Sequence, residues 1–343
     1  MVSVVVPCNH DFEDLKILLS EIIKGNLVPN EIIVVNSNSK SNSKTKSIIY
    51  DGYDEQTIHD ESNLGNRFRD LGINLTIINQ LNVFPGDARN IGIKNTTGEI
   101  IAFLDVKTIP TYDWLKKACD SLKNESIQGV WGATIYQSDS FLSSIILDAI
   151  YGRKPLRSIP GTVMKKECLP VIGQMVSWVP AGEDGDWIAR IKAHKLNFKT
   201  PLEHNTTYCG LANKNINYFI KKWWYYYNLS RMFPINDRDR WISYILGYAL
   251  IIFLAFNWNY QISEFIFGTY IFVPHITKTV LVSGLSFYLL LRGIYLPLAR
   301  GVPVSHLLPF RFIQLIIVTI ILDLVKTTAL LMPSKILEKL KIR

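Results

Sequence analysis

The stretch "ARNIGIKNTTGEIIAFLDVKTIP", residues 88–110, places a helical segment directly before a buried strand that ends in an acid. Residues 86–98 favour a helix, and the apolar run within residues 99–105 favours a strand that stops at Asp105. Similar β-branched runs predict three more strands at residues 2–7, 31–35 and 75–80. Strands alternating with helices predict an α/β domain with a mainly parallel sheet.

The carboxyl ends of these strands are the expected place for a ligand. In an open parallel sheet, ligands bind beyond the carboxyl ends of the strands. The polar residues that end or follow the predicted strands are therefore the first candidates for a site: Pro7, Asn9, Asn36, Ser37, Asp105 and Lys107.

Composition divides the 343-residue chain into two parts. Up to about residue 215 charged and apolar residues are mixed, as in a soluble domain, whereas residues 241–258 and 279–298 are apolar enough for membrane spans. Residues 216–343 hold 14 Lys and Arg against 5 Asp and Glu, a surplus of +9, which leaves −1 for residues 1–215. The basic excess therefore belongs to the membrane part, and a neutral folded domain argues against nucleic acid as a partner.

Cysteine usage and the amino terminus predict a cytoplasmic location for the first domain. The four cysteines are scattered without zinc-binding spacing, which is typical of free thiols in a reducing compartment. The first residues, "MVSVVVPCNHD", lack the basic start and the long apolar run of a signal peptide.

The carboxyl-terminal part predicts an integral membrane protein. We expect a catalytic-size domain at residues 1–215, an amphipathic interfacial helix and linker at 216–238, transmembrane helices at 239–332 and a basic cytoplasmic tail at 333–343. With both ends inside, the number of crossings is even: either four, or two with a re-entrant or interfacial remainder. Residues 311–332 contain Asp323 and Lys326, which are costly in lipid unless they are paired.

Five motifs in order resemble the family 2 glycosyltransferases with the GT-A fold. They are "VSVVVPCNH", "EIIVVNSNS", "ARNIGIKNTTGEIIAFLDVKTIP", "PGTVMKKE" and "GEDGDWIARIKAHKL". The resemblance implies a GT-A fold, Rossmann-like with a mainly parallel sheet, followed by an α-helical membrane region. It also implies a nucleotide-sugar donor.

Asp105 matches the first aspartate of the family's Asp-X-Asp motif, and Lys107 stands at the second. An ammonium is a donor-only cation and cannot bind Mg²⁺ or Mn²⁺. Three alternatives stay open: metal-independent transfer with Lys107 near the diphosphate, a divalent metal held by other ligands such as Asp105 and His204, or a solvated Lys107 that faces away from the site.

Further site residues follow from the resemblance. Pro7, Asn9, Asn36, Ser37 and Arg89 match donor-binding positions, with amides in place of the usual acids at the nucleotide base. Asp184 matches the catalytic base, which an inverting transferase needs to deprotonate the acceptor hydroxyl, and Glu183 would orient it. The predicted acceptor-binding residues are Gly161, Thr162, Asp186 and Trp187.

These features together predict an inverting, nonprocessive glycosyltransferase of a cell (inner) membrane. It would move a sugar from a nucleotide sugar to a polyprenyl phosphate or a lipid-linked saccharide, in surface polysaccharide or glycolipid synthesis. A noncatalytic nucleotide-sugar-binding scaffold is the alternative, and a processive synthase is disfavoured because "DRDRW" at 237–241 lacks the glutamine of the Gln-x-x-Arg-Trp motif. Formation of a homo-oligomer stays open.

Overall fold

The computed structural model describes residues 1–9, 11–37, 47–49, 62–211, 214–230 and 276–331, with Gly247, Ala249 and Phe253. Most of the predicted membrane stretch at 241–258, residues 231–238 of the predicted interfacial helix and linker, and the tail at 333–343 lie outside the described residues.

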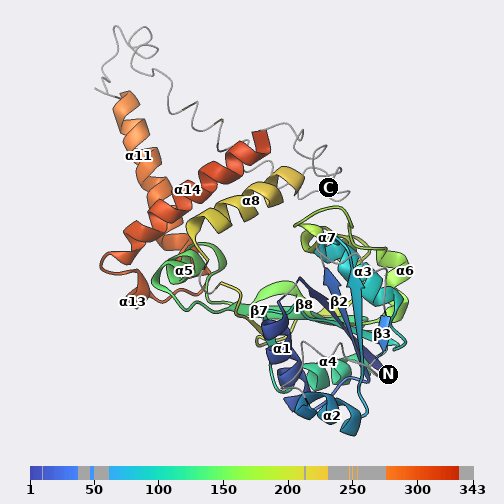
Figure 1. The fold of residues 1–343 in the computed structure, drawn as a ribbon. Helices are drawn as coiled ribbons and strands as arrows, with labels where there is room; N and C mark the ends of the chain where they lie inside the picture. Colours follow the sequence, from blue (N-terminus) through green and yellow to red (C-terminus); the bar gives the residue numbers. More distant parts are fainter. Residues whose placement is uncertain are drawn as a thin grey trace, which may run out of the picture.

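A mixed, mostly parallel sheet forms the centre of the first domain (Figure 1). Its strands are β1 (Val2–Cys8), β2 (Glu31–Ser37), β3 (Ser47–Ile49), β4 (Asn74–Gln80), β5 (Ile100–Phe103), β6 (Thr108–Pro110), β7 (Gly129–Tyr136), β8 (Leu156–Lys165), β9 (Phe198–Lys199) and β10 (Thr206–Tyr208). Along the sheet they run β3-β4-β2-β1-β5-β8-β7-β10-β6, with β9 beside β7. β4, β2, β1 and β5 are parallel, and β8 is antiparallel to both β5 and β7.

Helices cover both faces of this sheet. They are α1 (Phe12–Lys24), α2 (Ser62–Asp70), α3 (Pro85–Lys94), α4 (Trp114–Leu122), α5 (Phe141–Ile146), a π-helical turn η1 (Leu147–Tyr151), a 3₁₀ turn η2 (Lys166–Cys168), α6 (Leu169–Ile172) and α7 (Glu183–Ala193). Figure 1 shows α1, α2 and α4 on one side of the sheet and α3, α6 and α7 on the other.

The alternation along β1 explains the two layers. Val4 and Val6 are completely buried against α1 and α4, whereas Val5 is buried on the opposite face with Trp187 of α7. Successive side chains of a strand point to opposite faces, so a strand that is apolar at every position needs a helix layer on each side. The run "VSVVV" therefore encodes a central strand.

A second helical part follows the sheet domain. It consists of α8 (Ile216–Ser230), α11 (Ile276–Leu290), the π-helical turn η3 (Leu291–Tyr295), α12 (Leu296–Ala299), α13 (Val304–Leu307) and α14 (Arg311–Leu331). Within the described part of the chain, two segments are long and apolar enough to cross a membrane, Lys278–Ala299 and Arg311–Ala329.

The predicted α/β sheet is confirmed, including the strands at residues 2–7, 31–35, 75–80 and 99–105. The segment "GTVMKKE" belongs to β8, which is longer than expected and antiparallel to its neighbours. The sequence did not reveal β3, β6, β9 and β10, because each has only two or three residues, too few for a period of two to show. The eight-residue β7 was also missed.

Glu31 connects the start of β2 to the turn before β5. Its carboxylate is buried and accepts hydrogen bonds from the Ser3 hydroxyl and from the backbone amides of Thr97 (2.6 Å) and Gly98 (3.1 Å). Burial acts to raise the pKa of Glu31, but these three donors outweigh it and the pKa is lowered.

We expect Glu31→Gln to destabilise the protein by about 2 kcal/mol at pH 7, since hydrogen bonds to a charged acceptor are worth ~1.5–3 kcal/mol. A lowered carboxyl pKa contributes stability that is present above the ordinary Glu range and is lost as the pH falls through the lower folded value. The difference in melting temperature between the variant and the wild type should therefore shrink in acid.

Glu13→Gln is the matched control, because the Glu13 side chain is 87% exposed. A pH-independent difference for Glu31→Gln would contradict the charge-linked part of this account.

Candidate active site

Parallel strands bring their carboxyl ends to one edge of the sheet. Among the described strands, β1, β2, β4, β5, β7, β9 and β10 point the same way. Asp105 follows β5 at this edge, and Glu183 and Asp184 open α7. The sheet thus assembles polar residues from positions far apart in the chain.

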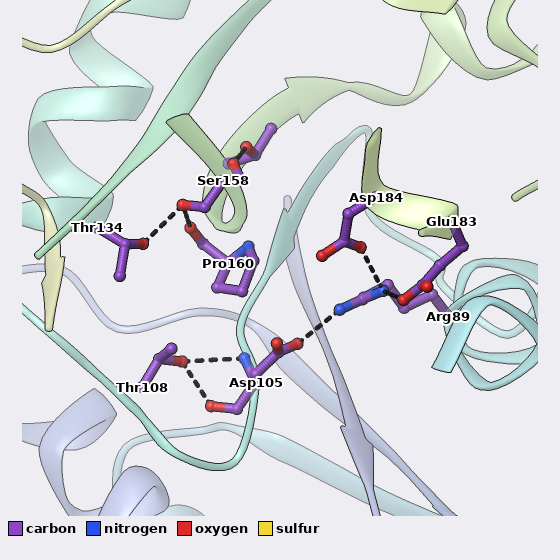
Figure 2. A network of polar contacts seen from close by, with 9 residues as sticks. Arg89, Asp105, Thr108, Thr134, Ser158, Pro160, Glu183 and Asp184 are labelled. Atoms are coloured by element: carbon purple, nitrogen blue, oxygen red, sulfur yellow. Dashed lines mark hydrogen bonds and ion pairs between the residues drawn. The ribbon is translucent and has the colours of Figure 1, made fainter. Parts of the chain in front are cut away.

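Arg89 of α3 joins three carboxylates at this edge (Figure 2). Its Nη1 donates to Glu183 Oε1 at 3.0 Å and to Asp184 Oδ1 at 2.8 Å, and its Nη2 donates to Asp105 Oδ1 at 2.8 Å. The Arg89 side chain is only 2% exposed, whereas Asp105 and Asp184 keep 29% and 40% of their side-chain surface accessible. The cluster therefore has a buried cation and two carboxylates that a ligand can reach.

Local sequence explains how Arg89 reaches this position. Gly92, one turn after it, lies so close to β1 that a Cβ would stand 2.4 Å from Val5 Cγ1. Any larger residue would push α3 off the sheet. On the other side, the Thr108 hydroxyl accepts from the Asp105 amide at 3.0 Å and donates to the Asp105 carbonyl, which fixes the turn after β5.

One guanidinium cannot neutralise three carboxylates, so the proton affinity of the cluster rises. Burial and the neighbouring Asp184 charge raise the pKa of Glu183 to about 7, although Arg89 acts to lower it. Loss of hydration also raises the pKa of Asp184; Arg89 opposes this, and Asp105 adds to it. Asp184 is partly accessible at its surface yet has protein on most sides, which is why desolvation still acts on it.

Lys107 does not join this cluster. Its Nζ lies 2.9 Å from Asp11 Oδ2 and 3.7 Å from Asp14 Oδ2, at the start of α1. Partial burial acts to lower the pKa of Lys107, but Asp11 outweighs it and the pKa is raised, so the amine stays charged. The alternative of a solvated Lys107 therefore does not fit, because the amine is paired with Asp11.

The predicted donor-binding residues of β1 and β2 lie at the same edge. Pro7 pairs in register with Val35, and Asn9 directly follows β1 and is exposed. Asn36 is buried and its Nδ2 donates to Asn79 Oδ1 of β4 at 2.9 Å, while Ser37 beside it is half-buried. The Asn36 amide is thus already engaged within the sheet.

The polar groups of Gly161 and Thr162 have hydrogen-bond partners within the protein. Gly161 has φ of +86°, and its carbonyl accepts from Trp114 Nε1 at 2.8 Å. The fully buried Thr162 hydroxyl accepts from the Gly132 amide and donates to the Ser158 carbonyl. Thr162 thereby holds the β-bulge between β7 and β8, and Gly161 connects β8 to α4, so their contact with an acceptor stays a prediction.

Asp186 and Trp187, also predicted to bind the acceptor, are both buried. Trp187 is completely buried, with its ring 5.6 Å from that of Phe103 in an edge-to-face arrangement. Asp186 is buried and pairs with Arg190 one turn later at 2.8 Å. Trp187 thus anchors α7 to the sheet, whereas the ion pair of Asp186 lies within α7, and the contact of both residues with an acceptor stays a prediction.

His204 lies at the wrong end of its strand for the cluster. It precedes β10, whereas Tyr208 at the carboxyl end of β10 is close enough to Asp105 for its pKa to be raised by that charge as well as by burial. The structure therefore does not bring His204 and Asp105 together.

The donor set at this edge does not fit a divalent metal. Asp105 and Asp184 each direct an oxygen at Arg89, and the second position of the Asp-X-Asp motif is a lysine bound to Asp11. Across the described residues no three His, Cys, Asp or Glu side chains gather as metal ligands. A positively charged guanidinium stands where the carboxylates converge.

Sequence reasoning missed an aromatic cluster and two residues of α8. Tyr136, which ends β7, stacks on Tyr151 with the ring centroids 4.1 Å apart, and its ring centroid lies 5.2 Å from that of Tyr208. Burial raises the pKa of Tyr136, with Asp184 and Asp105 contributing, so these rings flank the carboxylates. Their signal was their position at strand ends, which becomes visible only when β7 and β10 are assigned.

From α8, the Lys222 amine lies 3.4 Å from the Tyr151 hydroxyl, and its charge acts to lower the pKa of Asp184. The Tyr226 hydroxyl lies 3.2 Å from where a Cβ on Gly185 would stand, in the first turn of α7. The helix expected only at a membrane interface therefore also borders the carboxylate cluster.

The mostly parallel sheet with acids at its carboxyl edge has the arrangement that the sequence predicted for a GT-A fold. Residues 3–157 match the family described as glycosyl transferase family 2. This part of the chain, just under half of its length, is therefore similar to members of that family. The match includes Arg89 and Asp105 and ends before Glu183 and Asp184.

Solved structures with similar folds include three transferases. The Pyrobaculum calidifontis mannosyltransferase PcManGT, in complex with GDP-Man and Mn²⁺, is 16% identical over 66% of this chain and 61% of its own, with a TM-score of 0.44. Staphylococcus aureus TarS 1–349 with UDP-GlcNAc is 13% identical over 96% and 90%, with a TM-score of 0.43. Glucosyl-3-phosphoglycerate synthase from Mycobacterium tuberculosis, with Mn²⁺, UDP and its product, is 13% identical over 64% and 74%, with a TM-score of 0.38.

The alignment spans less than two thirds of the mannosyltransferase, and these similarities say nothing about the substrate of this chain. No curated protein matches the sequence significantly.

We expect Arg89→Met to destabilise the protein by about 3–5 kcal/mol at pH 8, because removing one partner leaves buried charges uncompensated. Arg89 lowers the pKa of Glu183 and Asp184, so both values rise without it. The destabilisation should become smaller as the pH falls, since protonation then removes the repulsion. Thermal unfolding at several pH values measures this.

Lys94→Met is the control, because Lys94 is exposed on the same helix. An Arg89→Met penalty that grows in acid would show that the cluster is not held by charge.

Proposed function

We propose that this protein is a glycosyltransferase that adds a single sugar to an acceptor embedded in the membrane. Transfer takes place on the cytoplasmic side and inverts the configuration at the anomeric carbon. The donor is a nucleotide sugar, and the acceptor is a polyprenyl phosphate or a lipid-linked saccharide used for surface polysaccharide or glycolipid. The observation that carries this proposal is the position of the carboxylate cluster around Arg89, which lies beside α8. α8 belongs to the same helical part of the chain as the two segments that are apolar enough to cross a membrane.

Asp184 is the proposed general base. The acceptor oxygen attacks the anomeric carbon as the bond from that carbon to the diphosphate breaks, and the hydroxyl proton passes to an Asp184 oxygen. Asp184 suits this role because it is accessible and its pKa is raised toward neutrality by desolvation. Arg89 keeps it ionised and aimed, and Glu183, buried behind it, shares the guanidinium.

Cationic side chains are proposed to stabilise the departing nucleoside diphosphate. Lys222 is near enough for its charge to bear on Asp184, and Lys107 holds the start of α1 through Asp11. A fixed positive charge aimed at the leaving group acts in the transition state without reorganisation. Because the donor set does not fit a divalent ion, no step is assigned to a metal.

The direct test is transfer of labelled sugar to lipid by purified full-length protein, with a panel of nucleotide sugars and native membrane lipids. We expect Asp184→Asn to lower kcat by roughly 10²–10⁴-fold, the usual contribution of a general base. The thermal unfolding of this variant should stay close to that of the wild type.

The two acceptor classes separate in the same assay. A phosphate acceptor is largely deprotonated at neutral pH and needs no base, so retained activity in Asp184→Asn would identify it and remove the assigned role of Asp184. Absence of transfer from every donor by the folded wild type would instead favour the noncatalytic scaffold.

We expect Lys222→Met to reduce kcat by roughly 10-fold or more, since it removes a charge facing the leaving group. Lys221→Met is the matched control, because this neighbouring lysine is exposed on the same helix. Equal effects of both variants would mean that Lys222 acts only through the general charge of α8.

We expect transfer to continue when EDTA replaces added Mg²⁺ or Mn²⁺, because Arg89 and Lys222 already supply positive charge at the cluster. Initial rates with and without chelator measure this. Complete loss with EDTA and recovery with Mn²⁺ would contradict the cationic arrangement and point to a metal carried in with the donor.

A further inference from the structure

Helix α14 meets the length and hydropathy of a membrane span, yet it packs on the protein along its length. Of the most apolar stretch within Arg311–Ala329, 33% is buried inside the protein, compared with 6% for the corresponding stretch within Lys278–Ala299. Its partner is α8, which lies beside it (Figure 1).

The contacts run in the same order along both helices. Phe219 of α8 shares a buried cluster with Leu315 and Leu322 of α14. One turn on, the Lys326 amine lies 5.1 Å from the centre of the Trp223 ring, and the Asn228 amide donates to the Ala329 carbonyl at 2.9 Å. The two helices are therefore parallel neighbours.

α8 is in turn fixed to the catalytic domain. Phe219 packs in the same cluster as Ile146 and Leu147, and Lys222 contacts Tyr151. A fully crossing α14 would draw α8, with Lys221 and Lys222, into the hydrocarbon, because the two helices touch over most of the ~22 Å length of α8. Lysines and a folded polar domain do not enter that region.

The faces of α14 are inverted relative to a helix in water. Its outward stripe consists of Ile313, Ile317, Ile321 and Leu324, which are 45%, 53%, 36% and 60% exposed. Its inward face carries the polar groups: Asp323 pairs with Arg292 of η3 at 2.7 Å and with Lys326 at 3.3 Å. Spacing of four, four and three residues places the four apolar side chains in one narrow row. Among the described residues, no other part of the chain covers this apolar row.

Lipid is the occupant that the surroundings favour. α11, which η3 follows directly, is also apolar on its exposed surface: Val282 is 64% exposed and Phe287 is 67% exposed. α8 exposes Tyr218, Lys221 and Tyr225, an aromatic and basic set typical of the headgroup level. The apolar row thus belongs to a surface that already has the features of a bilayer boundary.

We propose that α14 lies flat in the surface of the membrane and does not cross it, with the row Ile313, Ile317, Ile321 and Leu324 immersed just below the headgroups. This inference rests on the membrane association in the proposed function. The α8–α14 pair then holds the carboxylate cluster at a fixed height above the lipid, where the attacking group of a membrane-embedded acceptor emerges.

The test is a depth measurement on full-length protein in nanodiscs of phosphatidylethanolamine and phosphatidylglycerol. Single cysteines replace Ile313, Ile317, Ile321 and Leu324 in turn and carry a nitroxide. Cys119 and Cys209 become serine, while Cys8 and Cys168 are buried and stay. Relative accessibility to oxygen and to a nickel chelate gives each depth.

We expect all four labels at one shallow depth, ~5–10 Å below the headgroups. A crossing helix would instead spread residues 313 and 324 over ~16 Å of depth, and that gradient would overturn the proposal. Labels shielded from both reagents would also overturn it, because another protein surface would then cover the row.

Labels at Val282 and Phe287 of α11 serve as the reference. If these two report water as well, the protein is not membrane-associated and the proposed function itself fails. If they report lipid while the α14 labels show a gradient or shielding, only the flat placement of α14 fails. Unchanged thermal unfolding confirms that each labelled variant is folded.

Discussion

The guanidinium of Arg89 is the interaction on which the rest of the site depends. It is buried, and it is shared by groups from three different elements: Asp105 after β5, and Glu183 and Asp184 at the start of α7. The dependence is mutual, since a buried cation is stable only with its anions and three close anions only with a cation. The close contact of Gly92 with Val5, the turn held by Thr108 and the burial of Trp187 all place one of these partners.

Much of the sheet was predictable because β1, β2 and β5 carry uninterrupted apolar runs, at residues 4–6, 32–35 and 100–103. The same physics put Asp105, Asn36 and Asn9 at one edge, as expected for parallel strands. What the sequence could not show was pairing across distance. Arg89 and Asp184 are 95 positions apart, and nothing in either segment indicates that the arginine is directed to carboxylates rather than to a ligand.

The type of a residue was also a weaker guide to its role in the site than its surroundings in the fold. Thr162 and Trp187 look suited to binding, but the structure buries them, and their polar groups are used within the fold. Conversely, Lys222 and Tyr226 appeared as ordinary members of an aromatic, basic helix, and only the packing of α8 brings them to the cluster. In α14, a period of 3.6 reveals an apolar face, but it does not show whether the helix lies in the membrane surface or crosses the membrane.

The cluster formed by Phe219, Ile146, Leu147, Leu315 and Leu322 combines side chains from the catalytic domain and from both later helices. The change of composition near residue 215 therefore does not separate two independently folding units. A chain ending there would leave Ile146 and Leu147 facing solvent, and the catalytic half would lose part of its own interior. This shared cluster makes the later helices part of how the sheet domain folds.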